Sequence, residues 1–178
     1  MEDDRHTIIA AFETTVAEKG WLSLDAADLA ESSGVSLARV RALFPRKIDL
    51  LDGLARAIDE EVLDEGLAEA DEPARDRLFE IMMRRMDALQ DRRPTIEALL
   101  RDLPRDPAAG AYRALSVPTS MSWMLRAARI DARGIEGLIK ARVLAALYGW
   151  VLRTWQTDDT DDMAPTMKAL DERLKLAE

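Results

Sequence analysis

The chain has 178 residues, of which 48% are hydrophobic, and it carries a formal net charge of −9. This composition predicts a folded globular protein and excludes an intrinsically disordered one, because disordered chains lack the apolar residues that build a core. With no cysteine in the sequence, disulfides, thiolate metal sites and cysteine nucleophiles are excluded as well. No apolar run approaches the ~20 residues that cross a membrane, so we expect a cytoplasmic protein without stable membrane insertion.

Three helices are expected at the N-terminal end, where apolar side chains recur every three or four positions. They are predicted over residues 4–19, 25–32 and 36–44. Gly20 is placed to end the first helix. Asp25 is placed to cap the second, with Asp28 three residues later as in a capping box. Gly34 then gives a tight turn, and Ser36 caps the third helix.

About six further helices follow from the same period in the rest of the chain. They are predicted over residues 46–65, 73–89, 94–103, 111–129, 132–157 and 163–177. Residues 104–110 are expected to form a loop, and Pro118 to kink or break its helix, since proline removes a backbone hydrogen bond. Asp162 stands where the N-cap of the last helix is expected. No segment alternates like a strand, so the predicted fold is all-α with about nine helices.

The third helix and its flanks form the sharpest charge anomaly in the chain. Residues 36–47 hold four cations and no acid, so they carry +4 while the remainder of the chain carries −13. Two short helices separated by a glycine turn, the second of them basic, are typical of a helix-turn-helix, whose second helix enters the DNA major groove. The pattern predicts a local DNA-binding surface on an otherwise acidic protein.

The order of these elements resembles a known family. AFETTVAEKGW is followed by LAESSGVSLARVRALFPRKIDLL and by an all-helical remainder, and residues 8–55 in this arrangement are similar to the TetR family of transcriptional regulators. The most specific features are Lys19-Gly20-Trp21, Leu29-Ala30, Gly34-Val35-Ser36, and Phe44-Pro45 followed by Lys47 and Leu50-Leu51. The resemblance implies a helix-turn-helix DNA-binding domain at residues 1–50 and a helical ligand-binding and dimerisation domain at residues 51–178.

The resemblance also implies a function. We expect a homodimer that binds a double-stranded DNA operator and acts as a repressor. A small lipophilic ligand is expected to release the DNA by shifting the spacing of the two DNA-binding domains. No cofactor is implied. The DNA-contact residues implied by the resemblance are Ser36, Leu37, Arg39, Arg41 and Lys47. Arg41 and Leu43 depart from the family pattern, which usually has an aromatic and a polar residue at these positions.

Two further surfaces are expected in the C-terminal part. Methionine and tryptophan suit an adaptable apolar pocket, although the same residues at helical spacing also describe plain core. The candidate pocket residues are Met82, Met86, Met121, Trp123 and Met124. The helix over 132–157 is apolar around much of its circumference, which indicates burial on two sides. The candidate dimer seam comprises Leu147, Trp150, Val151, Met167, Leu170 and Leu174.

A second interpretation stays open on the same fold. WQTDDTDDMAPTMKALDERL resembles the C-terminal part of the TetR-like lipid-binding accessory proteins of ubiquinone biosynthesis, which are not known for DNA binding. Residues 1–52 carry a net −4, which fits that role better than a DNA-binding head.

Neither an enzyme nor a metal site is expected. His6 is the only histidine, and no nucleophile accompanies it. The acidic loop over residues 158–162 lacks the glycine and the distal glutamate of a calcium-binding EF-hand.

Overall fold

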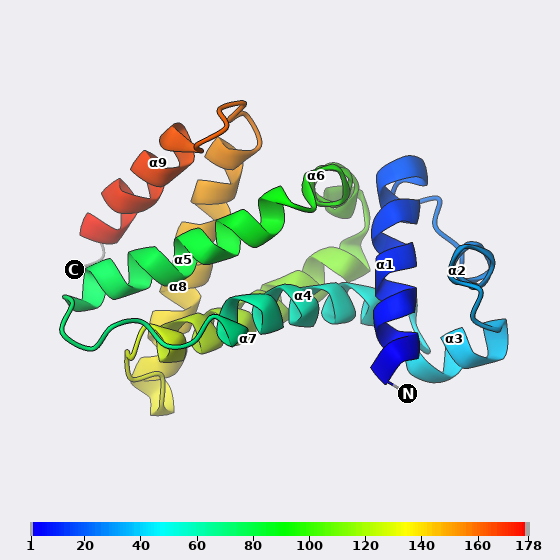
Figure 1. The fold of residues 1–178 in the computed structure, drawn as a ribbon, viewed down its shortest axis with the longest axis horizontal. Helices are drawn as coiled ribbons and strands as arrows, with labels where there is room; N and C mark the ends of the chain where they lie inside the picture. The colour runs from blue at the N-terminus through cyan, green and yellow to red at the C-terminus, as the bar shows by residue number, and fades with distance from the viewer. Residues whose placement is uncertain (1, 177–178) are drawn as a thin grey trace. The chain divides into compact units, whose positions relative to one another are not determined.

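The structure, a computed structural model, describes residues 2–176, and over that range it contains helices and no strand (Figure 1). The helices are α1 (Glu2–Lys19), α2 (Ala26–Ser33), α3 (Leu37–Leu43), α4 (Lys47–Asp64), α5 (Ala74–Gln90), α6 (Arg93–Asp102), α7 (Pro107–Ala127), α8 (Gly134–Trp155) and α9 (Ala164–Lys175). A short 3₁₀ turn, η1 (Leu103–Arg105), lies between α6 and α7. The predicted all-α fold is confirmed.

Packing divides these helices between two compact units. The first takes the chain up to Ile58 together with Leu89–Ala114, so α1, α2 and α3 share a unit with α6. The second takes Asp59–Ala88 and the chain from Leu115 onward, which includes α8 and α9. The functional boundary near residue 50 stays a prediction, because compactness groups residues by packing and says nothing of what they bind.

The starts and ends of the N-terminal helices follow from local chemistry. Gly20 and Gly34 adopt φ of +80° and +69°, the left-handed conformation that favours glycine. Asp25 accepts a hydrogen bond from the Ala27 amide, and the side chain of Asp28 accepts one from the Asp25 amide, which completes the predicted capping box. Ser36 accepts from the Arg39 amide at 3.3 Å and caps α3 as predicted.

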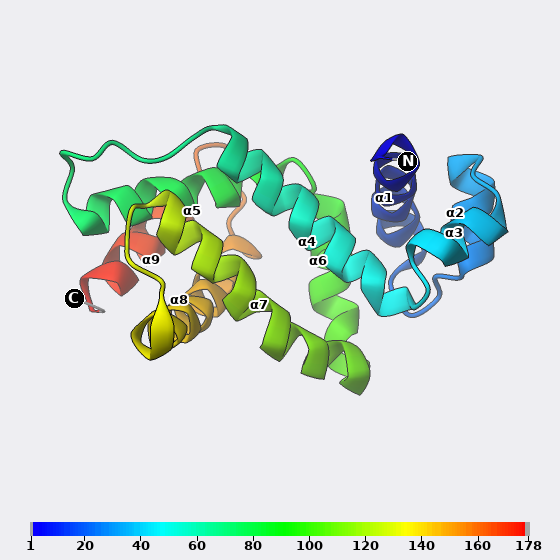
Figure 2. The same cartoon turned by 90° about the horizontal axis from the view of Figure 1, so that it is seen from below.

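Each unit has a core of its own. In the first, the rings of Phe12 and Trp21 meet edge to face with their centroids 6.3 Å apart, and both side chains are buried. In the second, α8 and α9 pack side by side as an antiparallel pair joined by a short loop (Figures 1 and 2). Val151, Trp155 and Leu170 on these two helices are fully buried.

Helix α7 differs from the prediction at its start and at its centre. It begins at Pro107 rather than after residue 110, because Asp106 Oδ1 accepts hydrogen bonds from the Ala108 and Ala109 amides and caps the helix. The loop predicted over residues 104–110 is therefore largely wrong. The helix also runs unbroken through Pro118 (Figure 2). Proline removes one backbone hydrogen bond, and the bonds of the neighbouring turns keep the helix continuous.

The acidic loop before α9 is built around Asp158, whose side chain is buried. Its Oδ1 accepts from the amide and hydroxyl of Thr160 at 3.1 and 2.6 Å. Its Oδ2 accepts from the amide and hydroxyl of Thr166 at 2.9 and 2.5 Å. Burial alone would raise the pKa of Asp158, but these four hydrogen bonds outweigh it and lower the pKa to about 2. Asp162 was predicted as the N-cap, but that position belongs to Met163, and Asp162 instead accepts from the Ala164 amide.

Candidate DNA-binding surface and ligand cavity

Helix α3 presents one face to its neighbours and the other outward. Val40 and Phe44 are buried and fix the inner face, while 51% of the Leu37 side chain is exposed on the outer face. Arg41 is also exposed, and among the described residues it has no hydrogen-bond or ion-pair partner. The outer face of α3 therefore combines an apolar side chain near its start with a cation one turn later, as a helix that reads base edges and contacts phosphate requires.

Arg39, another predicted DNA contact, is already paired within the chain. Its Nε donates to Asp4 Oδ2 of α1 at 2.8 Å, and both side chains are about a third exposed. Arg46 is paired as well, because its Nη2 lies 2.6 Å from Asp49 Oδ1 in the first turn of α4. The chain thus neutralises two of the four cations in residues 36–47, which the sequence pattern did not predict.

Lys47 begins α4 and is held by an aromatic ring rather than by an acid. Its Nζ lies 4.6 Å from the centroid of the Trp21 ring, a cation–π contact. Partial burial lowers the pKa of Lys47, and the nearby charges of Asp106 and Asp25 oppose that effect. Trp21 Nε1 in turn donates to Asp106 Oδ2 at 2.9 Å, so the residue that caps α7 also orients the ring under Lys47.

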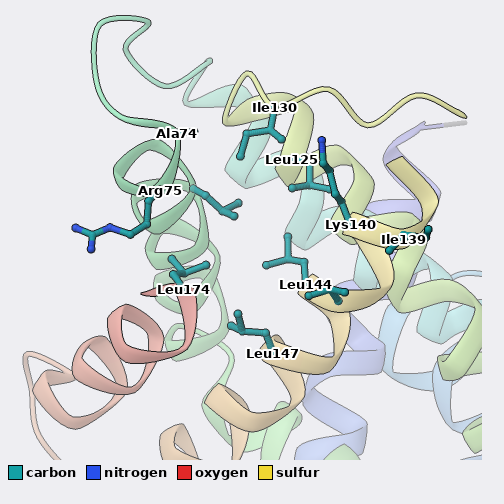
Figure 3. A pocket seen from close by; sticks show the side chains of 11 residues that line it. Ala74, Arg75, Leu125, Ile130, Ile139, Lys140, Leu144, Leu147 and Leu174 are labelled. Carbon is teal, nitrogen blue, oxygen red and sulfur yellow. The ribbon is translucent and has the colours of Figure 1, made fainter. Parts of the chain in front are cut away.

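The second unit contains an apolar cavity of about 320 Å³, lined from α5, α7, α8, α9 and the segment after α7 (Figure 3). Its apolar lining includes Leu78, Leu125, Ile130, Leu144, Leu147 and Leu174. This volume is at the lower end of the range of ligand pockets, roughly 300–1,000 Å³.

The predicted pocket residues do not line this cavity. Met82, Met86, Met121 and Met124 are fully buried in the core of the second unit. Trp123 is 47% exposed, with the Arg126 guanidinium 4.7 Å from its ring centroid. The reason lies in the helical period, since two residues rotate a helix by about 200° and put Trp123 on the face opposite Met121. A pocket among these side chains stays a prediction that the cavity does not support.

The six seam residues divide into two groups. Leu147, Val151, Leu170 and Leu174 are buried within the single chain, where α8 packs on α9. Trp150 and Met167 are 53% and 39% exposed. The outward face of α8 also carries the exposed side chains of Ile135, Leu138, Ile139 and Val143, which were not predicted.

A buried polar cluster in the second unit was missed entirely. Arg85 of α5 donates through Nη1 to Asp59 of α4, and the Ser120 hydroxyl of α7 donates to the same carboxylate oxygen at 2.6 Å. The Arg85 guanidinium also lies 5.3 Å from the centroid of the Tyr148 ring of α8. Arg85 Nε is buried without a hydrogen-bond partner among the described residues. Four helices thus each contribute one group to a charged cluster inside the unit.

Residues 2–176 contain neither a metal-binding cluster nor a membrane-spanning helix. No group of three or more His, Cys, Asp or Glu residues there is arranged to hold a metal ion. No helix in the same range is long and apolar enough to cross a membrane.

The chain matches known proteins through structure rather than sequence. No protein-family model and no curated protein matches it. The structure of a TetR transcriptional regulator from Nitrosomonas europaea is similar at 22% identity and a TM-score of 0.75, over 97% of each chain. A TetR transcriptional regulator from Rhodococcus sp. RHA1 is similar at 19% identity and a TM-score of 0.72, over 98% of this chain and 96% of that one.

A third neighbour is NalD, the secondary repressor of the MexAB-OprM multidrug efflux pump in Pseudomonas aeruginosa. It is similar at 17% identity and a TM-score of 0.56, over 98% of this chain and 95% of its own. The chain has the TetR fold. Because the matched share approaches the full length, the TetR fold accounts for both compact units and not only for the helix-turn-helix. At these identities the likeness establishes the fold alone.

Proposed function

We propose that the protein is a cytoplasmic, homodimeric, DNA-binding transcriptional regulator, a repressor that releases its double-stranded DNA operator when a small lipophilic ligand binds. The observation that carries the proposal is the outward face of α3. Its inner face is fixed by Val40 and Phe44, and its outer face leaves Leu37 exposed and Arg41 unpaired among the described residues. A helix presented in this way can lie in a major groove.

Arg41 and Lys47 are the cations best placed to contact phosphate. Arg41 has no partner to give up among the described residues, and Lys47 stands at the N-terminus of α4, where the helix amides also attract anions. Leu37 would offer an apolar contact of the kind that reads the thymine methyl group. Arg39 would have to exchange Asp4 for a phosphate, so its contribution is smaller.

Dimerisation is proposed through the outward face of α8. Isolated exposed apolar residues are ordinary, but several on one face of one helix are typical of an interface. Ile135, Leu138, Ile139, Val143 and Trp150 meet that description. The Trp150 ring is flanked by the guanidinium groups of Arg153 and Arg173 at 4.8 and 4.9 Å, which keeps it fixed on the surface. A twofold dimer would place two α3 helices for half-sites about 34–36 Å apart.

DNA binding is tested by capture of genomic fragments at ~50 mM salt, followed by a salt titration with the best fragment. Lys47→Ala should weaken binding to all fragments and lower the slope of log affinity against log salt by roughly 1. Lys168→Ala, which removes an exposed lysine of α9, is the matched control and should leave the slope unchanged. Retention of no fragment at ~50 mM salt would refute the regulator.

The net −4 of residues 1–52 favours the lipid-binding accessory role, whereas the exposed outer face of α3 favours the regulator. Asp4 neutralises Arg39 of α3, whereas Asp28 of α2 is engaged by Lys19 at 2.6 Å.

A further inference from the structure

The cavity of the second unit has a chemically uniform lining. Among the described residues that line it, nine are alanine, valine, leucine or isoleucine, and the other two are Arg75 and Lys140. None carries a hydroxyl, an amide or an aromatic ring. A polar group in the middle of a bound molecule would lose its hydrogen bonds to water and find no replacement, which costs free energy. The lining therefore favours a hydrocarbon ligand body without polar substituents.

The size of the cavity limits the length of that body. A volume of about 320 Å³ corresponds to roughly ten water-sized groups at ~30 Å³ each. A methylene group is of similar size, so a single unbranched chain of about ten carbons fills the space.

The two cations at the cavity differ in what they can offer a ligand. The guanidinium of Arg75 points away from the other lining side chains (Figure 3) and is occupied by Asp76 at 2.8 Å. The amine of Lys140 instead points to the side of the cavity where Leu125 and Ile130 lie (Figure 3). Its partner Glu136, at 2.6 Å, has a side chain that is 79% exposed. Such an exposed pair is weak, so a ligand anion can replace Glu136.

We propose that this cavity binds a medium-chain aliphatic carboxylate, with the chain among the leucines of α5, α8 and α9 and the carboxylate on Lys140 Nζ. Its binding does not depend on DNA. Only the consequence, release of an operator, rests on the proposed function. Ile139 and Val143 line the cavity and are 57% and 50% exposed in the single chain, so the cavity reaches the face of α8 through which we propose dimerisation.

Calorimetric titration of the purified protein with decanoate, without DNA, tests the proposal. Decanoate should bind to one site per chain. Decanol, which has the same chain and no charge, and decylammonium, which has the opposite charge, should bind at least tenfold more weakly. Equal affinity for decanol and decanoate would overturn the role of Lys140, and absence of decanoate binding would overturn the site. Decanoate binding by a protein that retains no DNA would separate this proposal from the regulator.

Variants test separately the contact of Lys140 with the carboxylate and the binding of the aliphatic chain in the cavity. Lys140→Gln should lower decanoate affinity about tenfold and leave decanol unchanged. Lys168→Gln removes a lysine from a comparable i,i+4 pair with Glu172 and should change neither. Leu144→Phe should abolish both by filling the cavity. If Leu144→Phe does not fold, Ile130→Phe, which changes a half-buried residue outside the helices, serves the same purpose. Full decanoate binding by a folded filling variant, or binding that falls as protein concentration rises because a second copy fills the cavity, would refute the proposal.

Discussion

Each unit contains an arginine–aspartate ion pair, and the two pairs differ in how far they are exposed to solvent. In the first unit Arg39 meets Asp4 with side chains that are 34% and 39% exposed, and in the second Arg85 meets Asp59 with side chains that are 6% and 15% exposed. An exposed pair contributes about 0–1 kcal/mol and is screened by salt. A buried pair is different, since removal of one partner leaves an uncompensated charge that costs about 3–5 kcal/mol. The Arg39–Asp4 pair is therefore adjustable by solvent and ligands, whereas the Arg85–Asp59 pair is a fixed part of the fold.

The largest expected effect comes from breaking the buried pair. Asp59→Leu should destabilise the protein by about 3–5 kcal/mol, because Arg85 cannot lose its proton and would remain buried without a counter-charge. Urea unfolding followed by circular dichroism measures this loss. The double variant Asp59→Leu/Arg85→Met should recover most of it, because replacing both charges with apolar groups is often neutral. Additive losses in the double variant would show that the two residues act independently.

The next largest effect on stability concerns Asp158, a buried carboxylate that hydrogen bonds stabilise without a positively charged partner. Asp158 is more deeply buried than Asp59, and its partners are the hydroxyl and amide groups of Thr160 and Thr166 rather than an arginine. Its pKa of about 2 in the folded state lies below the ordinary value of 3.8. The folded state therefore binds the proton less tightly than the unfolded state. The resulting stabilisation is complete above about pH 5 and is lost as the pH falls from about 4 to 2.

Acid titration of stability tests this assignment. The contribution of Asp158 is about 2 kcal/mol, because one pKa unit corresponds to 1.36 kcal/mol. Asp158→Asn should be less stable at pH 7 and should lose the matching part of its decline between about pH 4 and pH 2. Asp161→Asn, which removes an exposed carboxylate from the same loop, should keep the decline of the parent protein. An unchanged profile in Asp158→Asn would mean that other carboxylates cause the acid sensitivity.

Local patterns predicted the helix ends of the first 50 residues well. Gly20, Gly34, Asp25 and Ser36 act on backbone groups within a few residues, so their roles can be read from the sequence alone. Asp106 acts in the same way, but the prolines and the glycine around it indicated a loop and hid the cap.

The side-chain sites depended on contacts that no local pattern contains. Asp4 and Arg39 are separated by 35 residues, so their pairing is invisible in the sequence. Inward methionines predict a core and a pocket equally well, because both require the same helical face. The buried position of Arg85 could have been predicted from the sequence. Arg85 lies four residues after Ile81, on the face that also carries Met82 and Leu89, so its charge was placed inward.

The smallest effect on stability, and the most informative for DNA binding, comes from the exposed pair. Asp4→Asn should change the free energy of unfolding by less than about 1 kcal/mol. It should nevertheless strengthen DNA binding several-fold at ~50 mM salt, since Arg39 becomes free to contact phosphate and one acid next to α3 is removed. Fluorescence anisotropy with a labelled operator fragment measures both affinity and its salt dependence.

The neighbouring acid provides the control that makes this result specific. Asp3→Asn removes the same charge from the exposed start of α1, but it does not release Arg39. If only the long-range charge matters, both variants should bind DNA equally, and the difference from the parent should shrink as salt shortens the Debye length. If release of Arg39 matters, Asp4→Asn should exceed Asp3→Asn and should also gain about one unit in the salt slope. Equal behaviour of the two variants would therefore remove Arg39 from the DNA-contact set and leave Arg41 and Lys47 as its cations.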